Sequence, residues 1–558
     1  MKQAFDVCVI GSGAGAGPII YELAKAGWSV VILEKGPYFT TSDFRKDEIA
    51  CCRRDAYSSS PIREPYVIET PNGEGRWKKQ STARTGQSFW NGNMVGGSSN
   101  LMSGYFHRMK PIDFRLRSEF GDIKGAAVTD WPISYKDLEP YYTRCERIIG
   151  ISGRVIDHPW QPPRSTPDFP FPPLEEHVVA QWIDAACQHL GIPSVPTPRA
   201  ILSRPIRGRK SCYYSNYCGS YGCASNAKGS ARVALIEPAM NEGDVTLIPL
   251  AKVFALESDG HYRIRKAWYH ASDGTQRFVS ARLFVVACQA IESVRLLLMS
   301  QNKEYPKGVG NQHEQVGRYL IFSAGGSGYG TFAYDRLSPE DANSLRQRGT
   351  FVNRSVHHWY AFEDPDSGHL IKGGIIDFLW EHDNPVRKAL TQKWDGHRLR
   401  IGAELKRCLQ KAFLQQRRLR FEVFADWLPN PHTFVRLSSS VKDQWGDPVP
   451  CIRIGYHPHD IKVGKFLAQR AVEILRKAGA ENVEWSVSGF PPSNLQAGGC
   501  RFGTDPRTSV LDPNCRVHDV DNLYVTDGSF MPTGGSVPFT WTIYANAFRV
   551  ADHIKTAY

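Results

Sequence analysis

Residues 5–34 read FDVCVIGSGAGAGPIIYELAKAGWSVVILE, and this stretch decides the fold. Its first six residues form a β-prone apolar run that enters a glycine-rich turn, and the apolar residues from Ile19 to Ala24 then recur with helical spacing. Gly27 marks the end of that helix, and residues 30–33 form a second apolar strand pattern. The order strand, helix, strand predicts a Rossmann-like α/β unit at the start of the chain.

The small residues of this turn have separate predicted roles. Gly11 allows the tight turn, Gly13 lets the backbone approach a diphosphate, and Ala16 keeps helix and sheet close. Glu34 stands at the end of the second strand, 23 residues after Gly11, where a carboxylate binds ribose hydroxyls. We therefore predict a dinucleotide site; the alternative is a glycine-rich turn without a ligand. The predicted cofactor loop comprises Gly11, Gly13, Ala14, Gly15 and Ala16.

The composition is that of an ordinary globular enzyme with a large core. The 558 residues carry a formal net charge of +12, with 22% charged and 41% hydrophobic residues. Lys and Arg are dispersed, with no block of six like charges, so nucleic-acid binding is not predicted. Two basic clusters are interpreted as solvated surface or as docking sites for an acidic partner. They are Arg204, Arg207, Arg209 and Lys210, and Arg417, Arg418 and Arg420.

Apolar runs and cysteines bear on the cellular compartment. No apolar run reaches the roughly 18 residues of a membrane span, and the first strand begins five residues from the start, which leaves no room for a signal peptide. We predict a cytoplasmic protein without a transmembrane segment, although export of the folded chain with a partner is compatible with this pattern. The 13 cysteines, an odd number, argue against a disulfide framework.

Several later segments have clear local signals. Helices are predicted from Tyr135 to Gly150, from about Leu174 to Leu190, from Asp460 to Gly479 and from about Thr540 to His553. The run 281–297 predicts a buried strand that enters a helix, and 522–525 predicts another buried strand. Residues 321–490 alternate strand-like and aromatic stretches, which predicts an antiparallel sheet with helices above the cofactor.

The motifs together resemble one family over nearly the whole chain. They are GSGAGAG at 11–17, Glu34, GGSS at 96–99, VVACQAIES at 285–293, NLYVTDGSFMPT at 522–533 and A-x-R-x-A-D at 547–552. In this order they resemble the glucose-methanol-choline (GMC) oxidoreductases. Within that family, the chain looks most like the large FAD subunits of bacterial gluconate and fructose dehydrogenases.

The resemblance implies an α/β (α+β overall) fold of the GMC and p-hydroxybenzoate-hydroxylase type. A Rossmann-like FAD-binding domain would carry a discontinuous substrate domain with an antiparallel sheet. The expected boundaries are 1–125 for the first part of the FAD-binding domain, 126–200 for a linker and substrate-domain insertion, 201–320 for the second FAD part, 321–490 for the substrate domain and 491–558 for the third FAD part.

The resemblance also implies FAD rather than NAD. Asn100 and Leu101 follow the GGSS motif where some relatives carry a histidine that tethers the flavin, so non-covalent FAD is expected. The ADP half would be held by the glycine loop, Glu34 and Val253. The flavin half would be held by Gly96, Gly97, Ser98, Ser99, Asp527, Gly528 and Thr540.

Two catalytic residues of the family are absent. In the resemblance, a histidine accepts the hydroxyl proton while hydride passes to flavin N5, and a second His or Asn holds the alcohol oxygen. Here Leu495 stands at the first position, and Val537, followed by Pro538, stands at the second. The candidates for a replacement are His357, His358, His457, His459 and His518 as bases and Gln496 as a hydrogen-bonding group; each histidine could equally be structural or at the surface.

The loop 211–223 carries Cys212, Cys218 and Cys223 in the pattern C-x5-C-x4-C. Thiolates at such spacing can ligate one metal centre. In related dehydrogenase subunits a loop at this place resembles a three-iron, four-sulfur site, which would pass electrons to a partner protein or small subunit. Three unligated thiols are the alternative, and a closed zinc site would lack its fourth ligand.

These patterns support one leading function and two alternatives. The leading hypothesis is an FAD-dependent dehydrogenase that oxidises a hydroxyl of a sugar, glycoside or polyol and passes electrons to a partner or artificial acceptor. The first alternative is a flavoenzyme of the same fold with other chemistry, such as a lyase or isomerase, as Leu495 and Pro538 suggest. The second is a non-catalytic flavin-binding assembly subunit.

Overall fold

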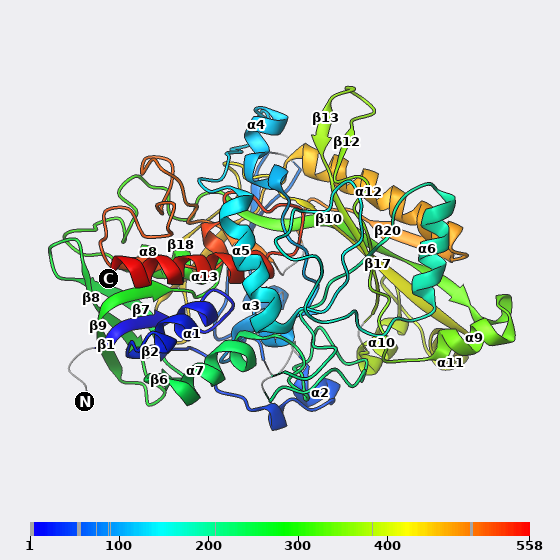
Figure 1. Cartoon of the computed structure of the whole chain (residues 1–558), viewed down its shortest axis with the longest axis horizontal. Helices are drawn as coiled ribbons and strands as arrows, with labels where there is room; N and C mark the ends of the chain where they lie inside the picture. The colour runs from blue at the N-terminus through cyan, green and yellow to red at the C-terminus, as the bar shows by residue number, and fades with distance from the viewer. Residues whose placement is uncertain are drawn as a thin grey trace.

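The computed structural model describes residues 5–52, 57–73, 75–86, 89, 91–206, 208–381, 383–491 and 495–558 (Figure 1). Arg207 of the first basic cluster and Asn494, beside Leu495, lie outside these described residues. Two large sheets, each with its own hydrophobic core, dominate the fold. The site described below lies between them.

The first sheet is built on the strands that flank the glycine-rich turn. β1 (Phe5–Ile10) lies between β2 (Val30–Leu33) and β9 (Gln276–Val286), and β6 (Val245–Ile248) and β22 (Leu523–Val525) complete the parallel part. β7 (Lys252–Ser258) and β8 (Ile264–His270) add an antiparallel extension to β9. The fully buried apolar runs of β1 and β2 are typical of parallel strands that are covered on both faces.

Helices from both ends of the chain pack together beside this sheet. α1 (Gly17–Lys25) contacts α13 (Thr540–Ala557), which contacts α5 (Tyr135–Cys145), as Figure 1 shows near the C-terminus. α8 (Ala290–Met299) follows β9 directly, as the run 281–297 predicts. The sheet and its helices therefore collect three distant parts of the chain into one Rossmann-like body, in agreement with the predicted fold class.

The second sheet is antiparallel, as predicted for residues 321–490. Its order is β20 (Glu481–Ser486), β10 (Leu320–Ala333), β17 (Gln416–Asp426), β14 (Gly374–Trp380), β11 (Arg354–Val356) and β5 (Val195–Pro196). β21 (Gln496–Gly498) pairs with the first residues of β10. α12 (Pro458–Lys477) packs on this sheet and on α6 (Val179–His189). β5 comes from the predicted insertion; the domain boundaries themselves stay a prediction.

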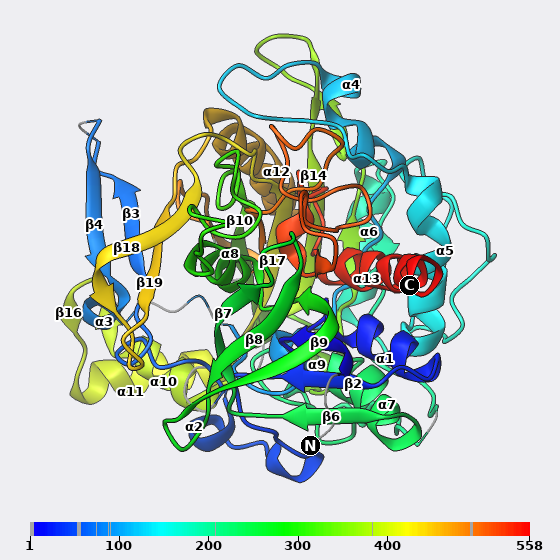
Figure 2. The ribbon, with the colours of Figure 1, turned by 90° about the vertical axis from the view of Figure 1, so that its left-hand side faces the viewer.

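Smaller elements surround the two sheets. Figure 2 shows a third sheet, of β18 (Phe434–Lys442), β19 (Pro448–Arg453), β3 (Val67–Pro71) and β4 (Trp77–Ser81), at its left. The remaining elements are α2 (Glu48–Cys51), α3 (Thr82–Thr85), α4 (Leu116–Phe120), α7 (Glu237–Glu242), α9 (Pro339–Arg346), β12 (Ala361–Glu363), β13 (Leu370–Lys372), α10 (Pro385–Gln392), β15 (Trp394–Asp395), β16 (Arg398–Leu399) and α11 (Gly402–Gln410). Among the described residues, no helix is long and apolar enough to cross a bilayer.

The helix boundaries differ from the predicted ones for local reasons. α5 ends at Cys145 and continues as a π-helical turn, Glu146–Gly150. α12 begins at Pro458 rather than at Asp460: His457 is its N-cap, and Asp460, the third residue, accepts the N–H of His457 at 2.9 Å. α6 begins at Val179, five residues after the predicted start, because Glu176 still forms a bridge to Phe351.

Candidate cofactor and substrate site

A cavity of about 1030 Å³ lies between the two sheets. It is lined by residues at the carboxyl ends of β1, β2 and β9, just beyond β22, and on β10 and β17. Ligands of open α/β sheets bind at the carboxyl ends of the parallel strands. The second sheet closes the other side, so that one cavity contacts both bodies.

The glycine loop forms a cradle at one end of this cavity. Gly11 has φ +91°, and a Cβ built on it would meet the carbonyl oxygen of Ala287 at 2.4 Å, so only glycine fits the turn. A Cβ built on Gly13 would meet nothing within 4 Å, because this residue faces the open cavity. α1 begins just after the loop, and the N–H groups of Ala16 and Gly17 donate to the carbonyl of Gly13 at 3.1 and 3.0 Å. The loop therefore fits a diphosphate.

Ser12 joins three segments of the site. Its hydroxyl donates to Glu34 Oε2 at 2.5 Å and accepts the N–H of Gly96 at 3.0 Å. Glu34 also accepts the N–H of Gly36 at 2.7 Å. Burial raises the pKa of the Glu34 carboxyl, and the hydrogen bonds from Ser12 and Gly36 oppose that rise. Glu34 lines the cavity in this fixed orientation.

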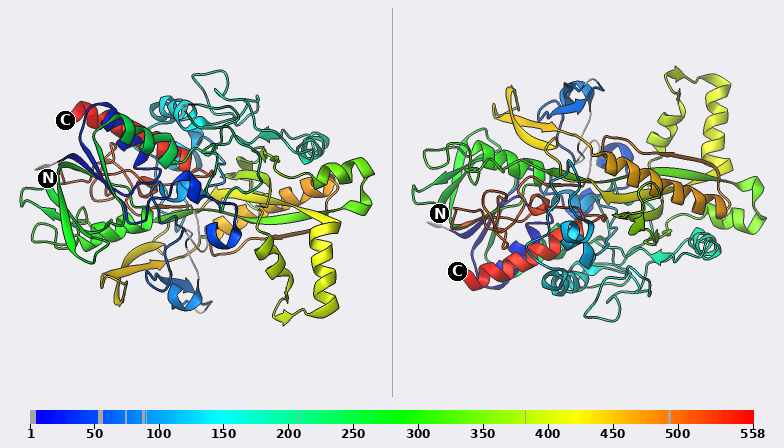
Figure 3. Two further views of the ribbon diagram at one scale, coloured as in Figure 1. Left: turned by 90° about the horizontal axis from the view of Figure 1, so that it is seen from below. Right: turned by 90° about the horizontal axis from the view of Figure 1, so that it is seen from above.

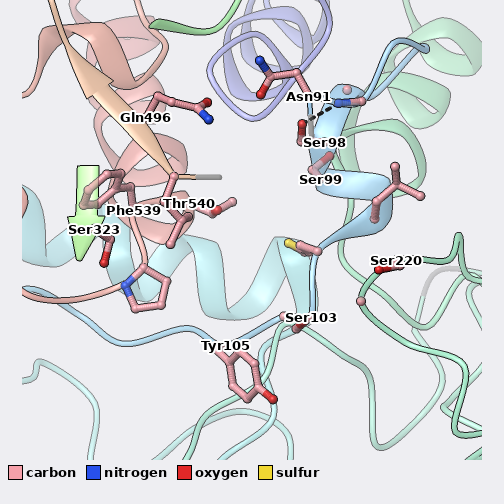
Figure 4. Close-up of a pocket in the computed structure, with 18 of the residues that line it drawn as sticks. Asn91, Ser98, Ser99, Ser103, Tyr105, Ser220, Ser323, Gln496, Phe539 and Thr540 are labelled. Carbon is pink, nitrogen blue, oxygen red and sulfur yellow. Dashed lines mark hydrogen bonds between the residues drawn. The ribbon is translucent and has the colours of Figure 1, made fainter. Parts of the chain in front are cut away.

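The GGSS segment packs directly on the glycine loop. A Cβ built on Gly97 would lie 3.2 Å from Gly13 Cα. Ser99 donates to the carbonyl of Gly96 at 2.5 Å and accepts the N–H of Ala231 at 2.9 Å, and Ser98 accepts the N–H of Gly92 at 2.8 Å. Figure 4 shows Ser98 and Ser99 beside Asn91 at the edge of the cavity.

Asp527 is fixed at the start of α8. One of its oxygens accepts the hydroxyl of Ser293 and the N–H of Gln289, and the other accepts the N–H of Ser529 at 2.9 Å. Burial raises the pKa of Asp527, against these hydrogen bonds. Gly15 lies so close that a Cβ built on it would meet Asp527 N at 2.7 Å. The two ends of the chain thus meet at one site.

Most residues that the sequence assigned to FAD line this cavity. They are Gly11, Gly13, Ala14, Gly15, Glu34, Gly97, Ser98, Ser99, Val253, Asp527, Gly528 and Thr540. Ala16 and Gly96 are not among the lining residues; Ala16 is the N-cap of α1, and Gly96 donates to Ser12. The open space above Gly13 and the carboxylate beside it fit the ADP half of a dinucleotide.

The part of the cavity beside Leu495 contains two buried polar groups that belong to no sequence motif. Leu495 and Pro538 line the cavity, whereas Val537 is fully buried outside it. The N–H of Ser323 donates to the carbonyl of Leu495 at 3.3 Å. Ser323 Oγ and Trp427 Nε1 are buried at this place, and within the described part of the chain neither has a hydrogen-bond partner.

Ser323 and Trp427 both line the cavity, so a ligand there would lie beside these unpaired groups. Leaving a buried polar atom without a partner costs about 1–3 kcal/mol, and a bound hydroxyl compound would supply the missing partner. Figure 4 shows Ser323 beside Phe539, on the same side of the cavity as Gln496 and Thr540. Gln496 is already engaged: its Oε1 accepts Gln289 Nε2 at 2.5 Å and its Nε2 donates to the carbonyl of Phe89 at 3.3 Å.

The histidines considered as bases lie elsewhere. In the described chain, no histidine lines the cavity. His457 caps α12, and His459 follows it in the first turn. His357 is buried with its Nδ1 3.4 Å from Lys110 Nζ, and burial lowers its pKa well below the usual range. The ring of His358 packs edge-on against Trp359, and His518 contacts Ser509 at 3.0 Å.

The cysteine loop gathers its three thiols without forming a recognisable metal site. Cys212, Cys218 and Cys223 pack around one small apolar cluster. Burial, and then the neighbouring Cys218 thiol, raise the pKa of Cys212 to about 12. Burial alone would also raise the pKa of Cys223, but the positive charge of Lys228 lowers this pKa to below its usual value. Across the described residues, no group of three or more His, Cys, Asp or Glu side chains could hold a metal ion.

The two basic clusters have different surroundings. Arg209 is buried and donates to the carbonyls of Ile149, Asn226 and Ala227, so it stabilises the fold rather than offering a docking surface. The second cluster borders the cavity. Arg417 stacks on Trp380 at 3.7 Å, Arg420 pairs with Glu422 at 2.9 Å, and Arg418 also lines the cavity.

Family models now identify the fold. Residues 79–322 match the N-terminal model, and residues 429–547 the C-terminal model, of GMC oxidoreductase. The chain belongs to the GMC oxidoreductase family. This confirms the resemblance seen in the sequence and makes the protein an oxidoreductase of a family whose members bind FAD.

Curated relatives match over nearly their full length. The 6'''-hydroxyparomomycin C oxidase of Streptomyces lividus is 30% identical, with 99% of this chain and 92% of the relative covered. The 2-methyl-1,2-propanediol dehydrogenase of Mycolicibacterium austroafricanum is 29% identical, with 99% and 95% covered. The fructose dehydrogenase large subunit of Gluconobacter japonicus is 27% identical, with 98% and 97% covered.

Solved structures share the fold at low sequence identity. Formate oxidase of Aspergillus oryzae RIB40 aligns with a TM-score of 0.65 at 15% identity, covering 100% of this chain and 99% of that one. Pyridoxine 4-oxidase of Mesorbium loti aligns with a TM-score of 0.59 at 16% identity, covering 99% of each chain. These alignments agree with the predicted two-part architecture.

Proposed function

We propose that this GMC oxidoreductase is an FAD-dependent dehydrogenase that oxidises a hydroxyl group of a sugar, glycoside or polyol and passes the electrons to a partner protein or external acceptor. One observation carries the proposal. Most of the residues assigned to FAD line the same cavity as Ser323 and Trp427. Within the described part of the chain, the buried Ser323 Oγ and Trp427 Nε1 have no hydrogen-bond partner.

The relatives support the substrate class. Their names include a fructose dehydrogenase, a propanediol dehydrogenase and an oxidase of an aminoglycoside, and all these compounds carry several hydroxyl groups. The three relatives share about the same degree of similarity with this chain. We therefore propose the class of substrate and not one of these compounds.

The residues of this chain would hold the substrate hydroxyl rather than deprotonate it. When bound, FAD supplies the acceptor for the hydride that leaves the carbon bearing the hydroxyl. Trp427 Nε1 can only donate to the substrate oxygen, whereas the Ser323 hydroxyl can donate or accept. Neither is a base at neutral pH, and Leu495 replaces the usual one. The hydroxyl proton would therefore pass to water in the cavity.

The proposal is tested by product analysis. Purified holoprotein is incubated with sugars, glycosides and polyols and an artificial electron acceptor. We expect acceptor reduction together with a product that has lost two hydrogen atoms. Trp427→Phe should lower kcat/KM for the same substrate, while Trp445→Phe, on the β18–β19 connection, should not. Acceptor reduction without a dehydrogenated product would contradict the assignment.

Leu495 and Pro538 favour a second candidate, a flavoenzyme of this fold with chemistry other than alcohol oxidation, such as a lyase or isomerase. It predicts product formation without net reduction of the acceptor. A non-catalytic flavin-binding subunit would show neither product nor flavin reduction with any member of the panel.

The route by which electrons leave the flavin is the most specific part of the proposal. A three-iron, four-sulfur cluster on Cys212, Cys218 and Cys223 rests only on their spacing and on their packing around one apolar cluster. Stoichiometric iron and acid-labile sulfide in anaerobically purified protein would support it. Their absence would mean that the acceptor must reach the flavin through the cavity itself.

A further inference from the structure

Residues 385–416 form a helical hairpin with an unusual distribution of side chains. α10 and α11 pack against each other, and the short strands β15 and β16 close the turn between them. Figure 3 shows this pair of yellow-green helices projecting from the body of the molecule. No residue of α10 or α11 is fully buried, so the hairpin adds little to the hydrophobic cores.

α10 turns its polar residues toward the cavity and its apolar residues outward. Lys388, Thr391 and Gln392 line the cavity. Val386 and Leu390, one helical turn apart, are 44% and 53% exposed. This is the reverse of the pattern expected for a surface helix of a globular protein, whose apolar stripe faces the core. Burial in the protein core therefore does not explain why Val386 and Leu390 are apolar.

The apolar surface continues around the tip of the hairpin. Trp394 is 52% exposed, and Leu399 and Ile401 are also exposed. At the base, Glu48 of α2 accepts the N–H of Val386 at 2.7 Å, and the exposed Ile49 follows Glu48 directly. Exposed large apolar side chains thus occur from α2 along the hairpin to its tip.

Positive charge accompanies this apolar surface. Residues 385–416 contain eight Lys and Arg and only two acidic residues, a formal excess of six out of the net +12 of the whole chain. The two acidic residues, Asp395 and Glu404, are both paired with Arg398. Half of the formal net charge therefore lies on this one projecting element, beside Trp and aliphatic side chains, although Arg387 and Lys388 line the cavity.

We propose that this hairpin docks the protein on an anionic lipid surface, with Leu390, Trp394, Leu399 and Ile401 entering the interface and the surrounding Lys and Arg contacting the headgroups. Helices that combine a basic face with exposed Trp and Leu bind in the membrane interface, and each basic residue near an anionic surface adds attraction. The apolar side chains spread over an outward, projecting surface rather than lining a groove, which suits a bilayer better than a single protein partner. Docking through this outward surface would leave the cavity side of α10 facing away from the lipid.

The proposal is tested by co-sedimentation of the full-length holoprotein with vesicles. We expect binding to vesicles of phosphatidylglycerol and phosphatidylcholine, little binding to phosphatidylcholine alone, and a loss of binding as NaCl rises. Trp394→Ser with Ile401→Ser should lower the bound fraction at least fivefold. The matched control, Trp485→Ser with Leu370→Ser, removes one exposed Trp and one exposed aliphatic residue elsewhere and should leave binding within twofold of wild type.

A second pair of variants tests the charge. Lys406→Gln with Arg407→Gln, on the exposed side of α11, should weaken binding to anionic vesicles and reduce its salt dependence. Equal binding of all variants, or no binding of the wild type, would overturn the proposal. So would a dimer in analytical ultracentrifugation that only Trp394→Ser with Ile401→Ser dissociates, because the surface would then serve a second copy of the chain. Turnover of a dissolved substrate should stay within twofold of wild type in every variant.

Discussion

The N–H of Ser323 donates to the carbonyl of Leu495 at 3.3 Å. This bond joins β10 of the substrate sheet to the segment that leads into β21, and it places the buried Ser323 hydroxyl beside the position at which the family resemblance implies a histidine. The Ser323 hydroxyl, which is not a base at neutral pH, thus lies next to Leu495. The chemistry proposed for this site rests on that arrangement.

Ser323→Ala should weaken turnover without affecting FAD content. The variant removes one hydrogen bond to the substrate hydroxyl, worth about 1 kcal/mol, so kcat/KM should fall about fivefold. Ser327→Ala is the matched control, because Ser327 lies on the same face of β10, four residues farther from Leu495. Equal effects of the two substitutions, measured by steady-state kinetics, would argue against a role for Ser323.

Leu495→His should introduce a pH dependence that the wild type lacks. No described histidine lines the wild-type cavity, so log kcat/KM should show no inflection near pH 6.5. An imidazole at position 495 acts as a base only when it is deprotonated, so the activity of the variant should rise with pH through the histidine pKa. The full pH profile of both proteins checks this. Identical profiles would show that position 495 does not face the reacting carbon.

Glu34→Ala should weaken FAD binding while the fold is retained. The variant removes the acceptor of the Ser12 hydroxyl and of the Gly36 N–H together with the carboxylate proposed to bind the ribose. Loss of a charge-assisted hydrogen bond of about 1.5–3 kcal/mol should raise the dissociation constant of FAD at least tenfold. Glu34→Gln, which keeps one carbonyl acceptor, should bind FAD with intermediate affinity. Full FAD occupancy of Glu34→Ala, determined from absorbance after desalting, would exclude this role.

Asp460 should make stability depend on pH. Burial raises its pKa to about 7, although the N–H groups of His457 and Leu428 act in the opposite direction. Because this value lies above the roughly 3.9 of an unfolded aspartate, the folded state binds the proton more tightly. The free energy of unfolding should therefore fall as pH rises from about 4 to 7, by at most about 1.4 kcal/mol per pH unit.

Asp460→Asn should flatten this dependence in thermal unfolding measured from pH 4 to 8. Asp137→Asn is the control. The N–H of Ser134 lowers the pKa of Asp137, so its contribution is lost only as pH falls below about 4. A wild-type slope that persists in Asp460→Asn would assign the pH dependence to another group.

The elements that the sequence predicted well are those specified by local pattern. The β1–α1–β2 unit, the β9–α8 passage and α13 each combine a buried apolar run with a glycine turn or a helical repeat, and the structure has them within a few residues of the predicted positions. By contrast, helices were expected within 321–490, but the positions of α9, α10 and α11 were not predicted. They are short and polar, and the outward apolar residues of α10 do not follow the usual rule for a surface helix.

The residues of the site differ in the same way: some belong to motifs that are visible in the sequence, and others do not. The FAD-binding residues belong to motifs whose spacing is visible in the sequence, and most of them line one cavity. Ser323 and Trp427 belong to no motif. Ser323 reaches Leu495 only because β10 pairs with β21, across more than 170 residues of sequence. The histidines considered from sequence were chosen by residue type alone, without the pairing that decides which side chains face the cavity.

The central claim is that a hydroxyl compound reduces a flavin bound in this cavity. The most direct measurement is the visible absorption spectrum of anaerobically purified holoprotein before and after addition of sugars, glycosides and polyols. The account predicts flavin bands in the starting protein and their bleaching by at least one member of the panel, with the bleaching slowed in Ser323→Ala. A flavin that stays oxidised with every hydroxyl compound tested would contradict the account.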